Sequence, residues 1–222
     1  MSIGNIFCDA SMDTYKKIGC AGIYLVSEDF RSPIDCYYVR QFRATNNSAE
    51  ILAIYHAVLM AIYYRNRKDY DFTKFRIFSD SKICIYGLRE WIYSWVNNQN
   101  KAGMLRRSDD APVLNQYYFK EIVRLILDNN IPISFVHQKG HMNLSDATME
   151  KAERFFCDTN GYYPKDIGAD IKYINAYNTE VDIKSRELLH DSTRTQLQYE
   201  SALVPLVKSS EMARFNALTH WI

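Results

Sequence analysis

The sequence predicts an α/β fold in which one sheet combines an antiparallel meander with parallel crossovers. Three β-rich runs open the chain, at residues 5–11, 19–27 and 33–42, and short turn segments separate them. An amphipathic helix at 48–64 follows, then a short buried strand at 75–80, two further helices and a last strand. A meander followed by alternating helices and strands favours one sheet with both kinds of connection.

The helices rest on apolar spacing. In the first of them, Ile51, Leu52, Tyr55, Val58 and Leu59 recur at the i, i+3, i+4 intervals that place side chains on one helix face. Similar patterns predict the later elements, which are helices at 81–98 and 113–130, a strand running into a loop at 131–141, a helix at 145–159 with Ser145 as N-cap, a loop at 160–170, and a helix over the second half of 170–189.

Composition limits the function classes. The 222 residues are 47% hydrophobic, which is enough for a sizeable core, and the net charge is only +1. No global basic field therefore indicates a nucleic-acid partner, and any such affinity must come from a local patch. The connection between the second and third helices offers one, formed by Lys101, Arg106 and Arg107.

The cysteines and the first residues of the chain indicate no metal site, disulfide framework or targeting signal. The five cysteines include no pair at CxxC spacing, which indicates neither a zinc site nor a disulfide framework, so we expect reduced thiols. The first residues lack the basic-then-apolar order of a signal peptide, and no apolar run reaches membrane length. We expect a cytoplasmic protein with no membrane partner.

Three carboxylates stand at special positions. Asp9 lies in the first strand, Asp80 ends the fourth, and Glu50 opens the first helix. Singly, Asp80 is explained as a helix N-cap and Glu50 as a favourable charge at a helix start. Asp9 is harder to dismiss, because an unpaired acid in an apolar strand is costly to bury. Three converging acids repel one another unless a cation neutralises them, and all-oxygen ligation suits Mg²⁺.

The motifs around these acids resemble those of the ribonuclease H type 1 family, in bacterial or phage-like form. They are "CDAS" at 8–11, "TNNSAE" at 45–50, "SDS" at 79–81 and "KGH" at 139–141, in the family's order and at similar separations. The resemblance covers about residues 3–141. It implies a five-stranded mixed sheet with three antiparallel and two parallel strands, flanked by helices.

The family pattern also requires a fourth metal-binding carboxylate on a later helix. "NTEVDIKSR" at 178–186 fits that pattern with Asp182 at the acidic position, and Glu153 and then Asp146 are the alternatives. Choosing Asp182 implies an insertion at about 142–177 within a catalytic domain of residues 1–189. Residues 190–222 are then a C-terminal extension of unknown role.

The resemblance implies an endonuclease that hydrolyses the RNA strand of RNA–DNA hybrids and leaves 5′-phosphates. Two Mg²⁺ ions, for which Mn²⁺ can substitute, would be held by Asp9, Glu50, Asp80 and Asp182. His141 would assist proton transfer or product departure, whereas His137 is expected to be packed. The resemblance also implies a setting, which is the removal of replication primers by a monomer with replication proteins as partners. The compartment is the cytoplasm of a bacterium or of a phage-infected host.

Substrate contacts are likewise implied by the resemblance. Ala10 and Ser11 are small enough for close minor-groove approach, and the amides of Asn46 and Asn47 can read sugar and base edges. Arg43, Thr45 and Asn115 resemble a phosphate pocket for the DNA strand. The simpler reading of Thr45 and Asn46 is helix capping. Trp91 and Trp95 are expected to pack rather than to stack on bases.

Two rival functions remain open at this level. Resolvases and transposases carry acidic triads on the same kind of sheet but act on DNA. A hybrid-binding module without catalytic activity is the other alternative, because a fold alone does not make an enzyme. The "TNNSAE" and "KGH" segments favour the hybrid-specific hydrolase.

Overall fold

A computed structural model describes residues 2–15, 18–40, 45–140 and 142–190, with the side chains of 37–40 excepted. The strands are β1 (Ser2–Asp13), β2 (Ile18–Val26), β3 (Asp35–Arg40), β4 (Phe72–Ser79) and β5 (Ile133–His137). The helices are α1 (Asn46–Asn66), α2 (Lys82–Tyr86), α3 (Ile92–Asn97), α4 (Gln116–Asn129), α5 (Asp146–Asn160) and α6 (Ile171–His190). A π-helical turn, η1 (Gly87–Trp91), joins α2 to α3, and a short 3-10 helix, η2 (Pro164–Ile167), precedes α6.

The strands form one five-stranded sheet in the order β3-β2-β1-β4-β5. The pairs β1–β2 and β2–β3 are antiparallel, and the pairs β1–β4 and β4–β5 are parallel. This confirms the predicted mixed sheet. The β1–β4 ladder ends at the pair Phe7–Phe78, although β1 continues beside β2 as far as Asp13.

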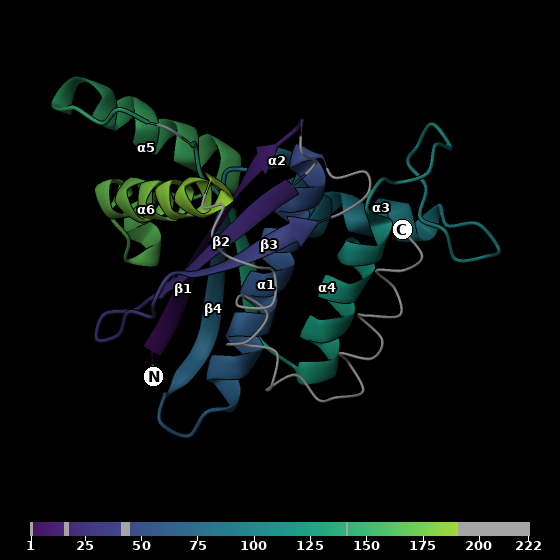
Figure 1. Ribbon diagram of the computed structural model, residues 1–222, viewed down its shortest axis with the longest axis horizontal. Coiled ribbons are helices and arrows are strands. Elements are labelled where there is room, and N and C mark those ends of the chain that lie inside the picture. Colours follow the sequence, from purple (N-terminus) through teal and green to yellow (C-terminus); the bar gives the residue numbers. More distant parts are fainter. Residues whose placement is uncertain (1, 16–17, 41–44, 141, 191–222) are drawn as a thin grey trace.

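Helices cover both faces of this sheet. Alternate side chains of a strand point to opposite faces, so Ile6 and Cys8 join the core beneath α1 and α4, whereas Phe7 joins a second apolar cluster beneath α5 and α6. Figure 1 shows α1 and α4 on one side of the strands and α5 and α6 on the other. The α1 face holds the larger cluster, because α1 is buried along nearly all of its length.

Three details differ from the sequence-based expectations. The helix expected at 81–98 contains the π turn η1, where Gly87 allows close packing, since a Cβ there would lie 2.6 Å from the Phe119 ring. The expected loop at 160–170 contains η2. Helix α6 begins at Ile171 and so occupies nearly the whole of the last segment rather than its second half.

The ends of the predicted domains stay predictions. Residues 191–222, which hold almost all of the expected C-terminal extension, lie outside the described residues. The inserted segment contributes α5 and η2 to the folded unit. Among the described helices, none has the length and apolar character needed to cross a bilayer.

Candidate active site

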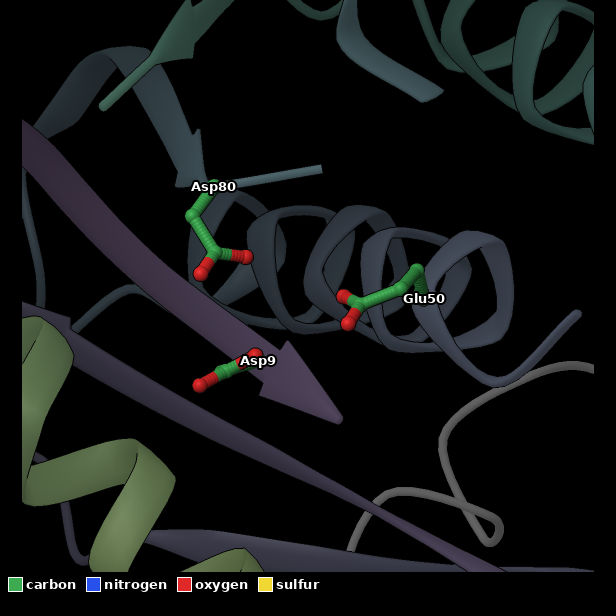
Figure 2. A group of neighbouring side chains, drawn as sticks. All are labelled: Asp9, Glu50 and Asp80. Atoms are coloured by element: carbon green, nitrogen blue, oxygen red, sulfur yellow. The ribbon is translucent and has the colours of Figure 1, made fainter. Parts of the chain in front are cut away.

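Three carboxylates from separate elements meet at one edge of the β1–β4 junction. Asp9 lies in β1 two residues beyond its last pairing with β4, Asp80 directly follows β4, and Glu50 lies near the start of α1. One oxygen from each carboxylate lies within 4.8 Å of the others. Figure 2 shows the three side chains turned toward the same space.

Local structure holds each of these positions. Thr45 caps α1 in a reciprocal capping box with Ser48, in which the Ser48 amide donates to Thr45 Oγ1 (3.2 Å) and the Thr45 amide donates to Ser48 Oγ (2.8 Å). The cap sets where α1 starts and therefore where Glu50 faces the sheet. Asp9 Oδ1 accepts a hydrogen bond from the Ala10 amide at 2.8 Å, which orients the Asp9 carboxylate.

The electrostatics of the cluster are unfavourable without a counter-charge. Burial, and next the negative charge of Asp80, raise the pKa of Asp9 from 3.8 to about 8. Burial, with Asp9 and Asp80, also raises the pKa of Glu50 well above its usual range. The pKa of the adjacent Cys8 thiol is raised as well, by burial and then by Glu50. Like charges are therefore concentrated in a poorly hydrated place.

The cluster fits a divalent cation. Glu50 Oε2 is buried and has no hydrogen-bond partner among the described residues. A buried carboxylate oxygen without a donor is costly unless a cation or water completes it. The donors that converge here from the described residues are carboxylate oxygens, which is the set preferred by hard divalent ions such as Mg²⁺.

Asp182 lies beside this cluster. It is only 5% exposed, it belongs to α6, and its charge adds to the rise in the pKa values of Asp9 and Glu50. Arg186, one turn later, donates from Nε to Asp182 Oδ1 at 2.9 Å. Asp146, by contrast, is exposed in the first turn of α5. Glu153 is half-buried in the same helix.

The packing of α6 on the sheet brings Asp182 to this position. Gly22 pairs with Asp9 across β1–β2, and a Cβ at Gly22 would lie 2.9 Å from Val181 Cγ1 and 3.0 Å from Val181 O. The absence of a side chain at Gly22 therefore lets α6 approach β2 closely. Ser11 and Ser185 share a hydrogen bond of 2.8 Å under the same helix.

The loop after β5 also contacts the cluster. A Cβ on Gly140 would collide with the carboxylate of Asp80, so the loop backbone passes directly over that acid. His137 is 4% exposed, and its Nε2 donates to the Asp80 backbone oxygen at 3.2 Å. It is packed, as expected. Burial lowers the pKa of His137 and keeps the ring neutral. His141 lies outside the described residues.

The predicted substrate residues fall into separate groups. Asn46 and Asn47 are exposed at the start of α1, close in sequence to Glu50. Asn47 and Asn115 line the same hollow of about 530 Å³. Ala10 is half-buried, whereas Ser11 is buried with its hydroxyl bonded inside the protein. Arg43 lies outside the part of the chain that the structure describes.

The hollow beside Asn47 has an aromatic wall. Trp91 and Trp95 line it, with ring centroids 6.0 Å apart, and Arg107 lines it as well. Trp95 is buried, as expected for packing, but Trp91 is 39% exposed. The basic patch is partly neutralised, because Arg106 pairs with Asp110 and Arg107 pairs with Asp109 within the same loop.

Several residues at the site were not identified from the sequence. Arg186 was available in the quoted "NTEVDIKSR" pattern, but its pairing with Asp182 follows only from helical i, i+4 geometry. Gln138 is 1% exposed and neither polar atom of its side chain has a partner among the described residues. Asn160, which bonds to the end of β5, carries no local signal at all.

The chain is similar to known proteins of one family. A family model for RNase H matches residues 2–154. A curated protein named Ribonuclease H from Tropheryma whipplei (strain Twist) is 34% identical over 124 residues, which are 54% of this chain and 70% of that protein. Among the solved structures to which the chain is similar are RNase H1 from Halobacterium salinarum NRC-1 and LC11-RNase H1 in complex with an RNA/DNA hybrid. The first is 20% identical, covering 71% of this chain and 96% of that one, with a TM-score of 0.42. The second is 16% identical, covering 74% and 99%, with a TM-score of 0.45.

Proposed function

This chain belongs to the ribonuclease H family, and we propose that it hydrolyses the RNA strand of RNA–DNA hybrids at the cluster of Asp9, Glu50 and Asp80. One observation carries the proposal: three carboxylates from β1, α1 and the end of β4 converge within 4.8 Å. An arrangement that costs so much electrostatically is retained at sites where a cation and a reaction need it.

The proposed reaction is an in-line displacement at phosphorus that leaves 5′-phosphate and 3′-hydroxyl ends. Two Mg²⁺ ions would supply an activated water and stabilisation of the leaving oxygen. Asp9, Glu50, Asp80 and Asp182 would hold them, since these carboxylates are mutually close or electrostatically coupled. Mn²⁺ would substitute, because it accepts the same oxygen donors.

The remaining groups orient the substrate and move protons. His141 follows Gly140, whose backbone lies against Asp80, and we assign it to proton transfer at the leaving oxygen or to product departure. Arg186 stays bonded to Asp182 and holds that carboxylate in place. His137 is neutral and buried, so it supports Asp80 rather than exchanging protons with substrate.

Hybrid recognition is assigned to the surface next to the carboxylates. Asn46 and Asn47 are exposed beside the helix start that carries Glu50 and would contact sugar and base edges in the minor groove. The hollow shared by Asn47 and Asn115 would take the DNA strand. The assignment of Arg43 and Thr45 to the phosphates of that strand rests on the family resemblance. The exposed face of Trp91 in that hollow supports contact with deoxyribose.

The test is a cleavage assay on three matched duplexes, namely RNA–DNA hybrid, DNA–DNA and RNA–RNA, with Mg²⁺ and separately with Mn²⁺. We expect cleavage of the RNA strand of the hybrid alone. The Asp9→Asn variant should lose cleavage while binding the hybrid about as tightly as the wild type. Preferential cutting of DNA would instead support a resolvase-like or transposase-like nuclease, and binding without cutting under either metal would support a hybrid-binding module.

The cellular setting is a further part of the proposal. Action as a monomer in the cytoplasm, on replication primers and beside replication proteins, follows from the family resemblance alone. Cleavage of a hybrid with an RNA-to-DNA junction, compared with a uniform hybrid, would test the role in primer removal. A chain that cuts only within uniform hybrids would contradict it.

A further inference from the structure

We infer that Asn160, the last residue of α5, is a positioning residue that fixes Asp80 through the backbone and ring of His137. The inference rests on the proposed function, because it assigns a role to a residue near the same site. Asn160 lies beyond residue 154, where the match to the RNase H family model ends. The inserted segment would then contribute to the site rather than merely lengthen the chain.

The side-chain amide of Asn160 clamps the end of β5. The His137 amide donates to Asn160 Oδ1 at 3.0 Å, and Asn160 Nδ2 donates to the His137 carbonyl oxygen at 2.7 Å. β5 is the outermost strand of the sheet that the described residues form, so none of them supplies a neighbouring strand on this side of His137. The Asn160 side chain therefore pairs with the backbone N–H and C=O of His137 as a further strand would, and it covers the sheet edge at this residue.

Neighbouring groups lock the orientation of this amide. Arg89 Nη1 donates to Asn160 Oδ1 at 3.0 Å and to the Thr159 carbonyl oxygen at 3.3 Å. Because the His137 amide and Arg89 Nη1 both donate to Oδ1, the side-chain amide of Asn160 can have only one of its two flip states. Asn160 Nδ2 also donates to the Phe156 carbonyl oxygen at 2.9 Å. The side chain is 6% exposed and its bonding capacity is used on both atoms.

The clamp continues to Asp80 by two routes. His137 Nε2 donates to the Asp80 backbone oxygen at 3.2 Å, and the amide of Gln138 donates to the Ser79 oxygen at 3.1 Å. His137 and Gln138 therefore connect the end of β5 to Asp80 and to Ser79, the last residue of β4. With its partner strand fixed, Asp80 has a fixed backbone from which its carboxylate reaches the cluster.

A second contact joins α5 to the same loop. Lys139 Nζ lies 5.5 Å from the centre of the Phe155 ring in a cation–π arrangement. The last turns of α5 thus contact His137 at the end of β5 and Lys139 in the loop that passes over Asp80. Because α5 touches both the strand end and the loop, movement of the C-terminal end of α5 would move the loop.

The experiment compares Asn160→Ala and Asn160→Asp with the control Phe156→Leu. Alanine removes both halves of the clamp, whereas aspartate keeps the acceptor for the His137 amide and for Arg89 but loses the donor to the His137 oxygen. Phe156 belongs to the same helix and is 1% exposed in the apolar cluster beneath it, but its side chain makes no part of the clamp. Phe156→Leu therefore reports destabilisation of α5 alone.

The first readout is amide hydrogen exchange, which needs no substrate. In Asn160→Ala the His137 amide should exchange about tenfold faster, as expected for loss of one hydrogen bond. The Gln138 amide, bonded to the Ser79 oxygen, is the internal control and should change much less. In Asn160→Asp the His137 amide should stay protected. Equal acceleration at both amides, or none at His137, would overturn the clamp.

The second readout is Mg²⁺ dependence, measured by calorimetric binding to the free protein and by hybrid cleavage. Supporting groups outside a metal site typically change affinity or activity by about 10–100-fold. We expect Asn160→Ala to bind Mg²⁺ about tenfold more weakly and to need correspondingly more for cleavage, with the KM for hybrid unchanged. Phe156→Leu should lose thermal stability without that shift.

The outcomes separate this inference from the proposed function. If the wild type does not cut hybrid, the proposed function fails, yet exchange and Mg²⁺ binding still test the clamp. If Asn160→Ala matches Phe156→Leu in Mg²⁺ affinity at equal loss of stability, Asn160 is only structural and the inference is wrong. If Asn160→Ala does not fold, Asn160→Asp decides. This variant should bind Mg²⁺ more weakly than the wild type without losing binding altogether, and its His137 amide should stay protected from exchange.

Discussion

Replacing Asp9 with asparagine should stabilise the metal-free protein. The substitution keeps an acceptor for the Ala10 amide, whose bond to Asp9 is 2.8 Å, but removes a charge from the cluster. The pKa of Asp9 rises from 3.8 to about 8, first through burial and then through Asp80. The raised pKa of Asp9 therefore lowers the free energy of unfolding at pH 7 by on the order of 4 kcal/mol, relative to a pH below about 4.

The pH dependence follows from the sign of that shift. Between about pH 4 and pH 8 the folded protein holds a proton on Asp9 that the unfolded chain has released. The contribution of Asp9 to the free energy of unfolding must then fall as pH rises through this window, and level off above about pH 8. Glu50, whose pKa is also raised, acts in the same direction. Asp9→Asn should reduce this slope because one of the two groups is gone.

The measurement is thermal or urea unfolding of wild type and Asp9→Asn, without divalent ions, at pH 5 and pH 8. We expect the variant to be more stable by about 2–4 kcal/mol at pH 8, with a gain of about 5–15 °C in Tm, and by much less at pH 5. Added Mg²⁺ should stabilise the wild type more than the variant, because binding to the folded state adds to its stability.

Two results would refute this reasoning. If Asp9→Asn were less stable than wild type at pH 8 without metal, the carboxylate would be favourably bonded rather than repelled. If the stability difference between Asp9→Asn and the wild type did not widen from pH 5 to pH 8, the raised pKa of Asp9 would be wrong in direction. Asp146→Asn is the matched control, since Asp146 is exposed on α5 and should change neither stability nor its pH dependence.

Three further substitutions test the geometry. Asp182→Asn should abolish cleavage, whereas Glu153→Gln should leave the cleavage rate within about twofold of the wild type. Strong loss of cleavage only in Glu153→Gln would contradict the choice of Asp182 as the fourth carboxylate. Gly140→Ala should lower cleavage by about tenfold or more with little change in Tm, because its Cβ would collide with the Asp80 carboxylate; unchanged kcat would contradict that contact. Gly22→Ala should cost about 1–3 kcal/mol in urea unfolding, since its Cβ would lie 3.0 Å from the α6 backbone; an unchanged midpoint would show that α6 can shift freely.

Much of the fold could be predicted because its elements carry strong local patterns. The apolar spacing in α1 and the continuous apolar runs of β1 and β2 are visible without tertiary information. The first half of α6 was missed for a physical reason. Of its buried positions, Ile171 and Ile174 are apolar, but Asn178, one turn further along, is polar, so the apolar stripe stops after two residues. In the second half the buried Ser185 depends in the same way on a distant partner, Ser11, which sequence periodicity does not include.

The carboxylate cluster was predictable for a different reason from the clamp. Asp9 and Asp80 occur at strand positions where parallel neighbours bring side chains together, and short motifs mark both. Asn160 has no such mark, because its function depends on which atoms of His137 face the open edge of β5. That direction follows from pairing in the sheet, and a helix-ending asparagine before Gly161 looks in sequence like an ordinary C-terminal turn.

The site exists because the sheet opens where its two central strands end. The last pair of β1 and β4 is Phe7–Phe78, so no ladder hydrogen bonds join the strands at Asp9 and Asp80. Asp9 faces α6, since it alternates with Cys8, which packs beneath α1, and pairs with Gly22 under Val181. Glu50 comes from α1 on the opposite face, and its oxygen still reaches within 4.8 Å of Asp9. Carboxylates from both faces can share this gap only if their repulsion is offset, and so the same feature that weakens the metal-free protein at pH 8 should strengthen its binding of a divalent cation.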